Sequence, residues 1–139
     1  SMKDSVEPSS LAHQDAAPVI LVLERDPLIA EDIIGSLGAV CDCRVVHASQ
    51  LEEFLAKLVE EAHVLAAFLE MRLSKVVESG LDQTLAQKGA GIVLTVGEDD
   101  QKQAQEKGWG MLVRPFSDQM IGEALRSVVR PEAGQVSIP

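Results

Sequence analysis

The sequence predicts an α/β fold in which five parallel strands form one doubly wound sheet, in the order 2-1-3-4-5, with helices on both faces. Short, continuously apolar runs recur along the chain, as is typical of strands covered on both faces, and helix-compatible segments separate them. Parallel strands need such crossover segments, which run right-handed. The length of 139 residues suits a single domain built from five strand and helix units.

The first unit begins with residues 19–23, a five-residue apolar run that ends at a polar Glu-Arg-Asp triplet. Pro27 suits a first helical turn, and Gly38 is expected to end the helix. Between them, apolar residues recur at helical spacing. They are Ala30, Ile33, Ile34 and Leu37.

The second unit begins with a short strand at residues 44–47. Ser49 and Glu52, three residues apart, predict a capping box at the start of the next helix. The apolar positions of that helix are Leu51, Phe54, Leu55, Leu58, Val59 and Ala62. The third unit has an apolar strand at 64–69 and a helix at 76–87, with Leu81 and Leu85 on one face.

The fourth unit combines an apolar strand at 92–96 with a polar helix from about residue 100 to 107. Its inner face offers little beyond Ala104, so this helix is expected to be weakly anchored. The fifth unit has a strand at 111–113 and a helix capped by Ser117. Its inward residues are Ile121, Ala124, Leu125 and Val128.

Both ends of the chain are expected to lie outside the domain, which spans 18–130. Residues 1–17 mix Ser, Asp, Glu and Pro without an apolar period, which predicts a disordered N-terminal tail. Residues 131–139 begin with a helix-stopping proline and are predicted to form a flexible C-terminal tail.

The composition argues against several classes of function. With 12 basic and 22 acidic residues, the net charge is −10, so the surface is expected to repel nucleic acid and anionic membranes. Aromatic residues make up 3% of the chain, too few for base-stacking platforms. No apolar run approaches the roughly 20 residues of a membrane span. We therefore expect a soluble cytoplasmic protein in a reducing compartment.

The cysteine and histidine residues offer little evidence for a metal site. Cys41, Cys43, His47 and His63 are close in sequence, but a C-x-C pair without a second pair is more typical of two packed or exposed thiols. Two cysteines are also too few for a disulfide framework. We expect neither a metal centre nor a disulfide scaffold.

Polar residues follow several of the predicted strands. In doubly wound sheets, chemistry gathers at the carboxyl ends of the strands, near the point where the strand order reverses. One crevice is therefore expected to collect the residues at these ends. They are Glu24, Arg25 and Asp26 after the first strand, Glu70 after the third, Thr95 near the end of the fourth, and Arg114, Pro115 and Phe116 after the fifth.

Four segments occur in an order that resembles one known family. They are V-L-E-R-D-P-L-I-A, A-A-F-L-E-M-R-L-S, L-A-Q-K-G-A-G-I-V-L-T-V-G and L-V-R-P-F. Together they resemble the response-regulator receiver domain, a flavodoxin-like fold, over about residues 19–130. The resemblance implies a role in two-component signalling. In such domains an Asp takes a phosphoryl group from a kinase phosphohistidine, an acidic pair holds Mg²⁺, and a hydroxyl residue and a Lys contact the phosphoryl oxygens.

The resemblance assigns roles by position. Glu24 matches the first acid of the pair, Arg25 falls on the second, and Asp26 follows them. Glu70 falls on the phosphoacceptor Asp, Thr95 on the hydroxyl switch residue, Arg114 on the Lys (with Pro115 after it), and Met111 on the aromatic switch residue. Arg25, Glu70 and Arg114 depart from the family pattern, and the chain has no Tyr.

These departures change the charge of the crevice. Glu24 and Glu70 are balanced by Arg25 and Arg114, so the site is neutral, or carries one negative charge if Asp26 points inward. A guanidinium supplies no oxygen ligand and repels Mg²⁺, so metal binding is predicted to be lost and no cofactor is expected. We expect Glu70 to pair with Arg25 or Arg114. The simpler alternatives are that Glu70 is a solvated loop acid and Thr95 an ordinary strand residue.

Three functions follow from these expectations. The first is a degenerate receiver that is not an enzyme and acts by phosphorylation-independent protein–protein contact. The second is a functional phosphoacceptor response regulator that uses Glu70 or Asp26. The third, a flavodoxin-like ligand binder, lacks a phosphate-binding Gly-rich loop after the first strand.

The expected partner is a histidine kinase or a downstream signalling protein. It would bind the face formed by the fourth predicted helix, the fifth strand and the fifth helix. A homodimer is also possible, whereas nucleic acid and membrane are not expected partners.

Overall fold

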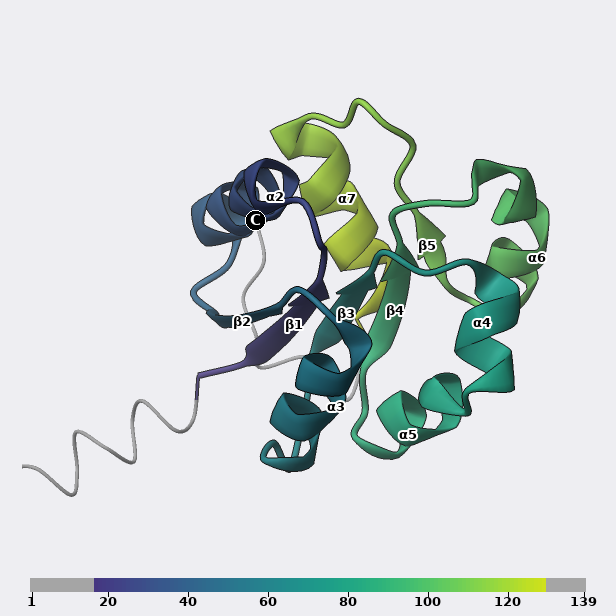
Figure 1. The fold of residues 1–139 in the computed structure, drawn as a ribbon. Helices are drawn as coiled ribbons and strands as arrows, with labels where there is room; N and C mark the ends of the chain where they lie inside the picture. The colour runs from purple at the N-terminus through teal and green to yellow at the C-terminus, as the bar shows by residue number, and fades with distance from the viewer. Residues whose placement is uncertain (1–16, 130–139) are drawn as a thin grey trace, which may run out of the picture.

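The computed structural model describes residues 17–129 and contains one five-stranded parallel sheet in the order β2-β1-β3-β4-β5 (Figure 1). The predicted fold class is confirmed. The strands are β1 (Val19–Leu23), β2 (Arg44–Ala48), β3 (Ala66–Leu69), β4 (Gly91–Leu94) and β5 (Gly110–Met111). The predicted C-terminal tail at 131–139, and all but residue 17 of the predicted N-terminal tail at 1–17, lie outside the described residues.

Helices cover both faces of this sheet (Figure 1). They are α2 (Pro27–Val40), α3 (Leu51–Val59), α4 (Leu73–Glu78), α5 (Leu81–Gln87), the 3₁₀ turn η1 (Glu98–Asp100), α6 (Gln101–Glu106) and α7 (Asp118–Val128). Within residues 17–129, no helix has both the length and the apolar character needed to cross a bilayer.

The core is divided into two layers by the alternation of side chains along the strands. In β1, Leu21 and Leu23 face α3, α4 and α5, whereas Ile20 and Val22 face α2 and α7. Every residue of β1 is buried. This explains why the strand reads as a continuous apolar run, because both of its faces are covered.

Two predicted helix boundaries are wrong. Gly38 does not end α2, which continues to Val40, because Gly38 does not adopt the positive φ with which a glycine commonly ends a helix. The predicted helix at 76–87 is instead two helices. They are separated at Ser79 and Gly80, where Gly80 has a φ of 76° and the Ser79 hydroxyl donates to the Val76 carbonyl.

The predicted capping box at α3 is also wrong. Gln50 is the N-cap residue, and Glu53 accepts hydrogen bonds from the backbone amide and the hydroxyl of Ser49, at 3.0 and 3.3 Å. Glu52 has no part in this arrangement. The helix ends at Val59, before Ala62, and Leu55 and Val59 are exposed on its outer side.

The two cysteines differ from the expectation of separate thiols. Cys41 and Cys43 form a disulfide in the loop between α2 and β2, because the turn brings their Cα atoms to 5.3 Å. Cys41 is buried against the core layer that contains α2 and α7.

Candidate functional site

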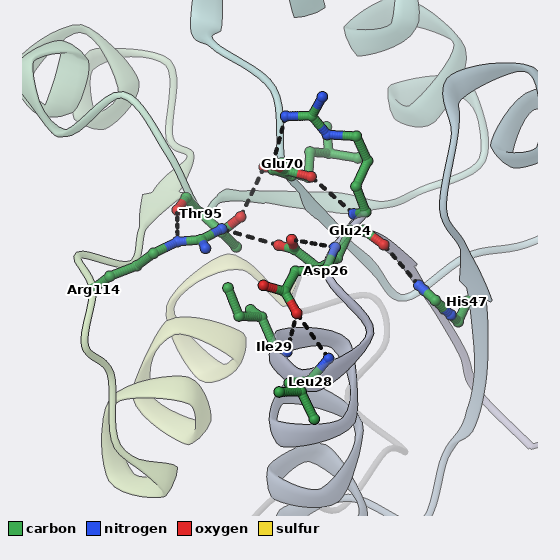
Figure 2. Close-up of polar contacts among 10 residues, drawn as sticks. Glu24, Asp26, Leu28, Ile29, His47, Glu70, Thr95 and Arg114 are labelled. Carbon is green, nitrogen blue, oxygen red and sulfur yellow. Dashed lines mark hydrogen bonds and ion pairs between the residues drawn. The ribbon is translucent and has the colours of Figure 1, made fainter.

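The carboxyl ends of β1, β3 and β4 lie side by side, and the segment after β5 reaches across to them (Figure 2). The loops at these ends bring together five of the side chains that the sequence placed there, and dashed lines in Figure 2 mark the hydrogen bonds and ion pairs that they make. The five are Glu24, Arg25, Glu70, Thr95 and Arg114.

Glu24 is the most deeply buried acid of the crevice, at 1% exposure. One of its carboxylate oxygens accepts a hydrogen bond from Arg114 Nη2 at 3.0 Å, and the other accepts from the Asp26 amide at 3.1 Å. Burial raises the pKa of Glu24 above its ordinary value, despite the opposing effects of the Asp26 amide and Arg114. Both oxygens of this carboxylate are therefore already engaged.

Glu70 makes a second, separate ion pair. Its Oε1 accepts from the Arg25 backbone amide at 2.9 Å, and its Oε2 accepts from Arg25 Nη2 at 3.2 Å. Burial acts to raise the pKa of Glu70, but these hydrogen bonds and the charges of Arg25 and Arg114 outweigh it, so the pKa lies below its ordinary value. The carboxylate is thus held by the loop after β1, and the alternative of a solvated loop acid is wrong.

Arg114 connects the end of β4 to the end of β1. Its Nε donates to the Thr95 carbonyl at 3.1 Å, while Nη2 reaches Glu24. Thr95 is buried, and its hydroxyl lies 3.4 Å from the Leu69 carbonyl as a donor. In this position Thr95 behaves as an ordinary strand residue, because its hydroxyl donates a hydrogen bond to a strand carbonyl.

Three other predicted residues lie outside the paired crevice. Asp26 is the N-cap of α2, where its carboxylate accepts from the amides of Leu28 and Ile29 and does not point into the crevice (Figure 2). Pro115 follows a cis peptide bond from Arg114. Met111 lies in β5 and packs, partly buried, against the core.

No metal site was found within residues 17–129: they contain no group of three or more His, Cys, Asp or Glu side chains placed to hold an ion. His47 instead donates from Nε2 to the Glu24 carbonyl, 2.9 Å away, because that carbonyl can only accept. The polar side chains that meet in the crevice include two carboxylates and two guanidiniums, and both Glu24 oxygens accept hydrogen bonds.

Sequence reasoning missed a third cluster at the same edge of the sheet. Arg72, in the loop after β3, donates to Asp99 and Asp100 in the turn after β4, at 3.1 to 3.3 Å. A usable signal was present: a basic residue follows one strand, acidic residues follow its neighbour, and the carboxyl ends of neighbouring parallel strands lie together.

Comparison with known proteins gives the class of fold. No protein-family model matches the sequence, and no curated protein matches it. The structure is similar to a response regulator receiver protein from Burkholderia phymatum, with a TM-score of 0.64 and 20% identity over 88% of this chain and 98% of that one.

Two further solved structures support the same class. A response regulator receiver domain protein from Clostridium thermocellum has a TM-score of 0.65 and 18% identity over 85% of this chain and 98% of that one. The chemotaxis protein CheY4 from Vibrio cholerae has a TM-score of 0.60 and 19% identity over 82% of this chain and 100% of that one. The fold is therefore that of response-regulator receiver domains.

Proposed function

We propose that this protein is a degenerate receiver domain of a two-component system that signals by protein–protein contact without being phosphorylated. The observation that carries the proposal is the pairing of each crevice carboxylate with a guanidinium, Glu24 with Arg114 and Glu70 with Arg25. The likeness of the fold to receiver domains supports the signalling class.

The proposed loss of Mg²⁺ binding follows from charge and from ligand supply. Mg²⁺ requires near-octahedral oxygen ligands, and a receiver-like site would draw them from two adjacent acids. Here Arg25 replaces one acid, and the oxygens of Glu24 accept hydrogen bonds from Arg114 and Asp26. With two acids opposed by two guanidiniums, the crevice has no excess negative charge to attract the ion.

The proposed absence of phosphotransfer rests on Glu70. A nucleophilic carboxylate needs a free oxygen aligned with the phosphoryl group, but both oxygens of Glu70 accept hydrogen bonds from Arg25. Compared with Asp, the extra methylene also displaces the carboxylate by about 1 Å, a misplacement that can reduce a rate on the order of 10²-fold. We therefore do not assign enzymatic activity to this chain.

We place the partner-binding face on α6, β5 and α7. A groove of about 480 Å³ runs along these elements, and its lining includes Trp109, Met111 and Met120. Met120, which is 36% exposed, contributes apolar surface to this groove. The partner that fits the proposal is a protein, either a histidine kinase, a downstream signalling protein or a second copy of this chain.

The test combines Mg²⁺ titration with acetyl-phosphate labelling of intact protein. The parent should show no saturable Mg²⁺ binding with a dissociation constant below about 1 mM and no mass increase from a phosphoryl group. The combined variant Arg25→Asp, Glu70→Asp and Arg114→Lys should gain both properties, because it restores three acids and one lysine. Glu70→Asp alone should gain neither, because the crevice stays neutral.

Labelling of the parent would contradict the proposal and favour a functional phosphoacceptor. Labelling of Glu70→Asp alone would show that Arg25 does not exclude the ion. Peptide mapping of the labelled residue then separates Glu70 from Asp26, whose carboxylate caps α2.

A further inference from the structure

The loop after β4 is held to the loop after β3 by one arginine. Arg72 Nε and Nη2 donate to the same Asp100 oxygen, at 3.2 and 3.1 Å. Nη2 also contacts both oxygens of Asp99, at 3.2 and 3.3 Å. One guanidinium thus binds two carboxylates, those of Asp99 and Asp100, which follow Arg72 by 27 and 28 residues in the sequence.

The backbone beneath this contact is shaped to receive Arg72. Gly97 has a φ of 81°, a conformation that other residues rarely adopt. A Cβ atom at Gly97 would also lie 2.9 Å from Arg72 Nε, so the arginine side chain would have to shift to make room for it. The arginine therefore packs directly on the turn as well as pairing with its acids.

The helix that follows has few other attachments. Within α6 the one buried residue is Ala104, and the remaining positions are Gln, Lys and Glu residues that face solvent. On a well-packed helix, an exposed ion-pair network contributes little to the free energy of folding compared with apolar burial. Because α6 buries little apolar surface, the same network can determine where this helix lies.

The tethered segment joins the crevice to the proposed partner face. Thr95 begins the turn and is bonded to β3 and to Arg114, while α6 and Trp109 border the groove at β5 and α7. The Thr95 hydroxyl is directed at the Leu69 carbonyl, and Arg72 holds Asp99 and Asp100 further along the same turn.

We propose that Arg72 is an electrostatic latch that fixes the loop after β4 and the position of α6 through Asp99 and Asp100, without a phosphoryl group. The latch rests on the proposed function, because it explains how an unphosphorylated crevice presents one constant partner face. It predicts that α6 is released when the Arg72 contacts are broken, while the crevice pairs and the sheet remain intact.

Hydrogen exchange measured by mass spectrometry, at low salt and without Mg²⁺ or phosphodonor, tests the latch. Arg72→Gln should accelerate exchange of amides in residues 97–107 by about tenfold, with unchanged exchange in β1 as the internal reference for folding. The matched control is Lys75→Gln, which removes a positive charge from α4, close to Arg72 in the sequence. It should change exchange in residues 97–107 by less than about twofold.

A second set of variants separates the latch from a general loss of charge. Asp100→Asn should resemble Arg72→Gln, whereas Asp99→Asn should have a smaller effect, because Asp100 accepts from both Nε and Nη2. The combination Arg72→Gln with Asp100→Asn should exchange no faster than Arg72→Gln alone, since both changes break the same contact. The emission of Trp109, which lies between α6 and β5, should shift in the same variants.

Equal exchange in Arg72→Gln and Lys75→Gln would overturn the latch, and so would additive effects of Arg72→Gln and Asp100→Asn. Neither readout involves phosphotransfer. Failure of the proposed function would appear separately, as labelling of the parent by acetyl phosphate.

Discussion

The two ion pairs of the crevice use the same chemical groups in different surroundings. Glu24 and Arg114 meet at 3.0 Å, with side chains 1% and 33% exposed. Glu70 and Arg25 meet at 3.2 Å, with side chains 14% and 78% exposed. The first pair connects β1 to the segment after β5, whereas the second connects adjacent loops at the surface of the crevice.

Burial gives these two carboxylates opposite properties. The pKa of Glu24 is raised because desolvation outweighs its hydrogen bonds, whereas the pKa of Glu70 is lowered because its hydrogen bonds from Arg25 outweigh desolvation. The buried pair is therefore expected to matter for stability once one partner is removed, and the exposed pair to matter mainly for charge and conformation.

The largest effect is expected for Arg114→Met. This change leaves Glu24 buried without its cation, and should lower the free energy of unfolding by about 3 kcal/mol in chemical denaturation. Arg25→Met is the matched control, because it removes a guanidinium that is mostly exposed, and its effect should be clearly smaller. Equal losses in the two variants would remove the distinction between the pairs.

A smaller effect is expected at Asp26, the acid that belongs to neither ion pair. Asp26→Ala removes the N-cap of α2 and should cost about 1 kcal/mol of unfolding free energy. Both pairs should survive, because Glu24 accepts from the backbone amide of residue 26. Asp26→Asn, which can still cap the helix, should recover most of the loss. If Asp26→Asn were as unstable as Asp26→Ala, capping would not be the role of this side chain.

The pH dependence of stability should differ in sign between the two acids. Glu24, with a raised pKa, contributes stability below the ordinary carboxyl value of 4.5, and this is lost as pH rises through its folded pKa. Glu70, with a lowered pKa, contributes stability above 4.5 that is lost as pH falls through its folded pKa.

Denaturation of Glu24→Gln and Glu70→Gln as a function of pH checks these signs. Relative to the parent, Glu24→Gln should gain stability as pH rises through the folded pKa of Glu24. Glu70→Gln should gain stability relative to the parent as pH falls below 4.5. If the stability of both variants relative to the parent changed in the same direction with pH, the pKa values of Glu24 and Glu70 would not be shifted in opposite directions.

The smallest effect is expected from salt. Raising the ionic strength from about 0.1 to 1 M shortens the screening length from about 10 to 3 Å and should weaken the coupling between Arg25 and Glu70. The coupling between Arg114 and Glu24 should change less, because Glu24 is buried. Double-mutant cycles at the two salt concentrations measure both couplings, and greater screening of the buried pair would contradict this ranking.

Several elements were predictable from the sequence because local patterns determine them. The bounds predicted for β1 agree with the structure, since five buried residues read as one apolar run. Ser117 caps α7 as predicted, accepting a hydrogen bond from the Met120 amide. The weak anchoring of α6 was also visible, because a helix with Ala104 as its sole inward apolar residue has little to bury.

Other features required the tertiary structure. The sequence placed two acids and two arginines at one edge of the sheet and left open which arginine would pair with Glu70. That choice depends on the loop after β1, which presents the Arg25 amide and guanidinium to Glu70 together. The bond between Arg114 and Glu24 likewise spans 90 residues of sequence.

The sequence by itself determined the order of strands and helices and the set of charged residues at the carboxyl ends of the strands, because hydrophobic periodicity is a local property. Only the tertiary structure decided that Asp26 caps α2, that Cys41 joins Cys43, and that Arg72 spans two loops. The physical reason is that a polar side chain at a strand end has several partners within reach. Its choice among them depends on the exact path of loops that no periodic pattern describes.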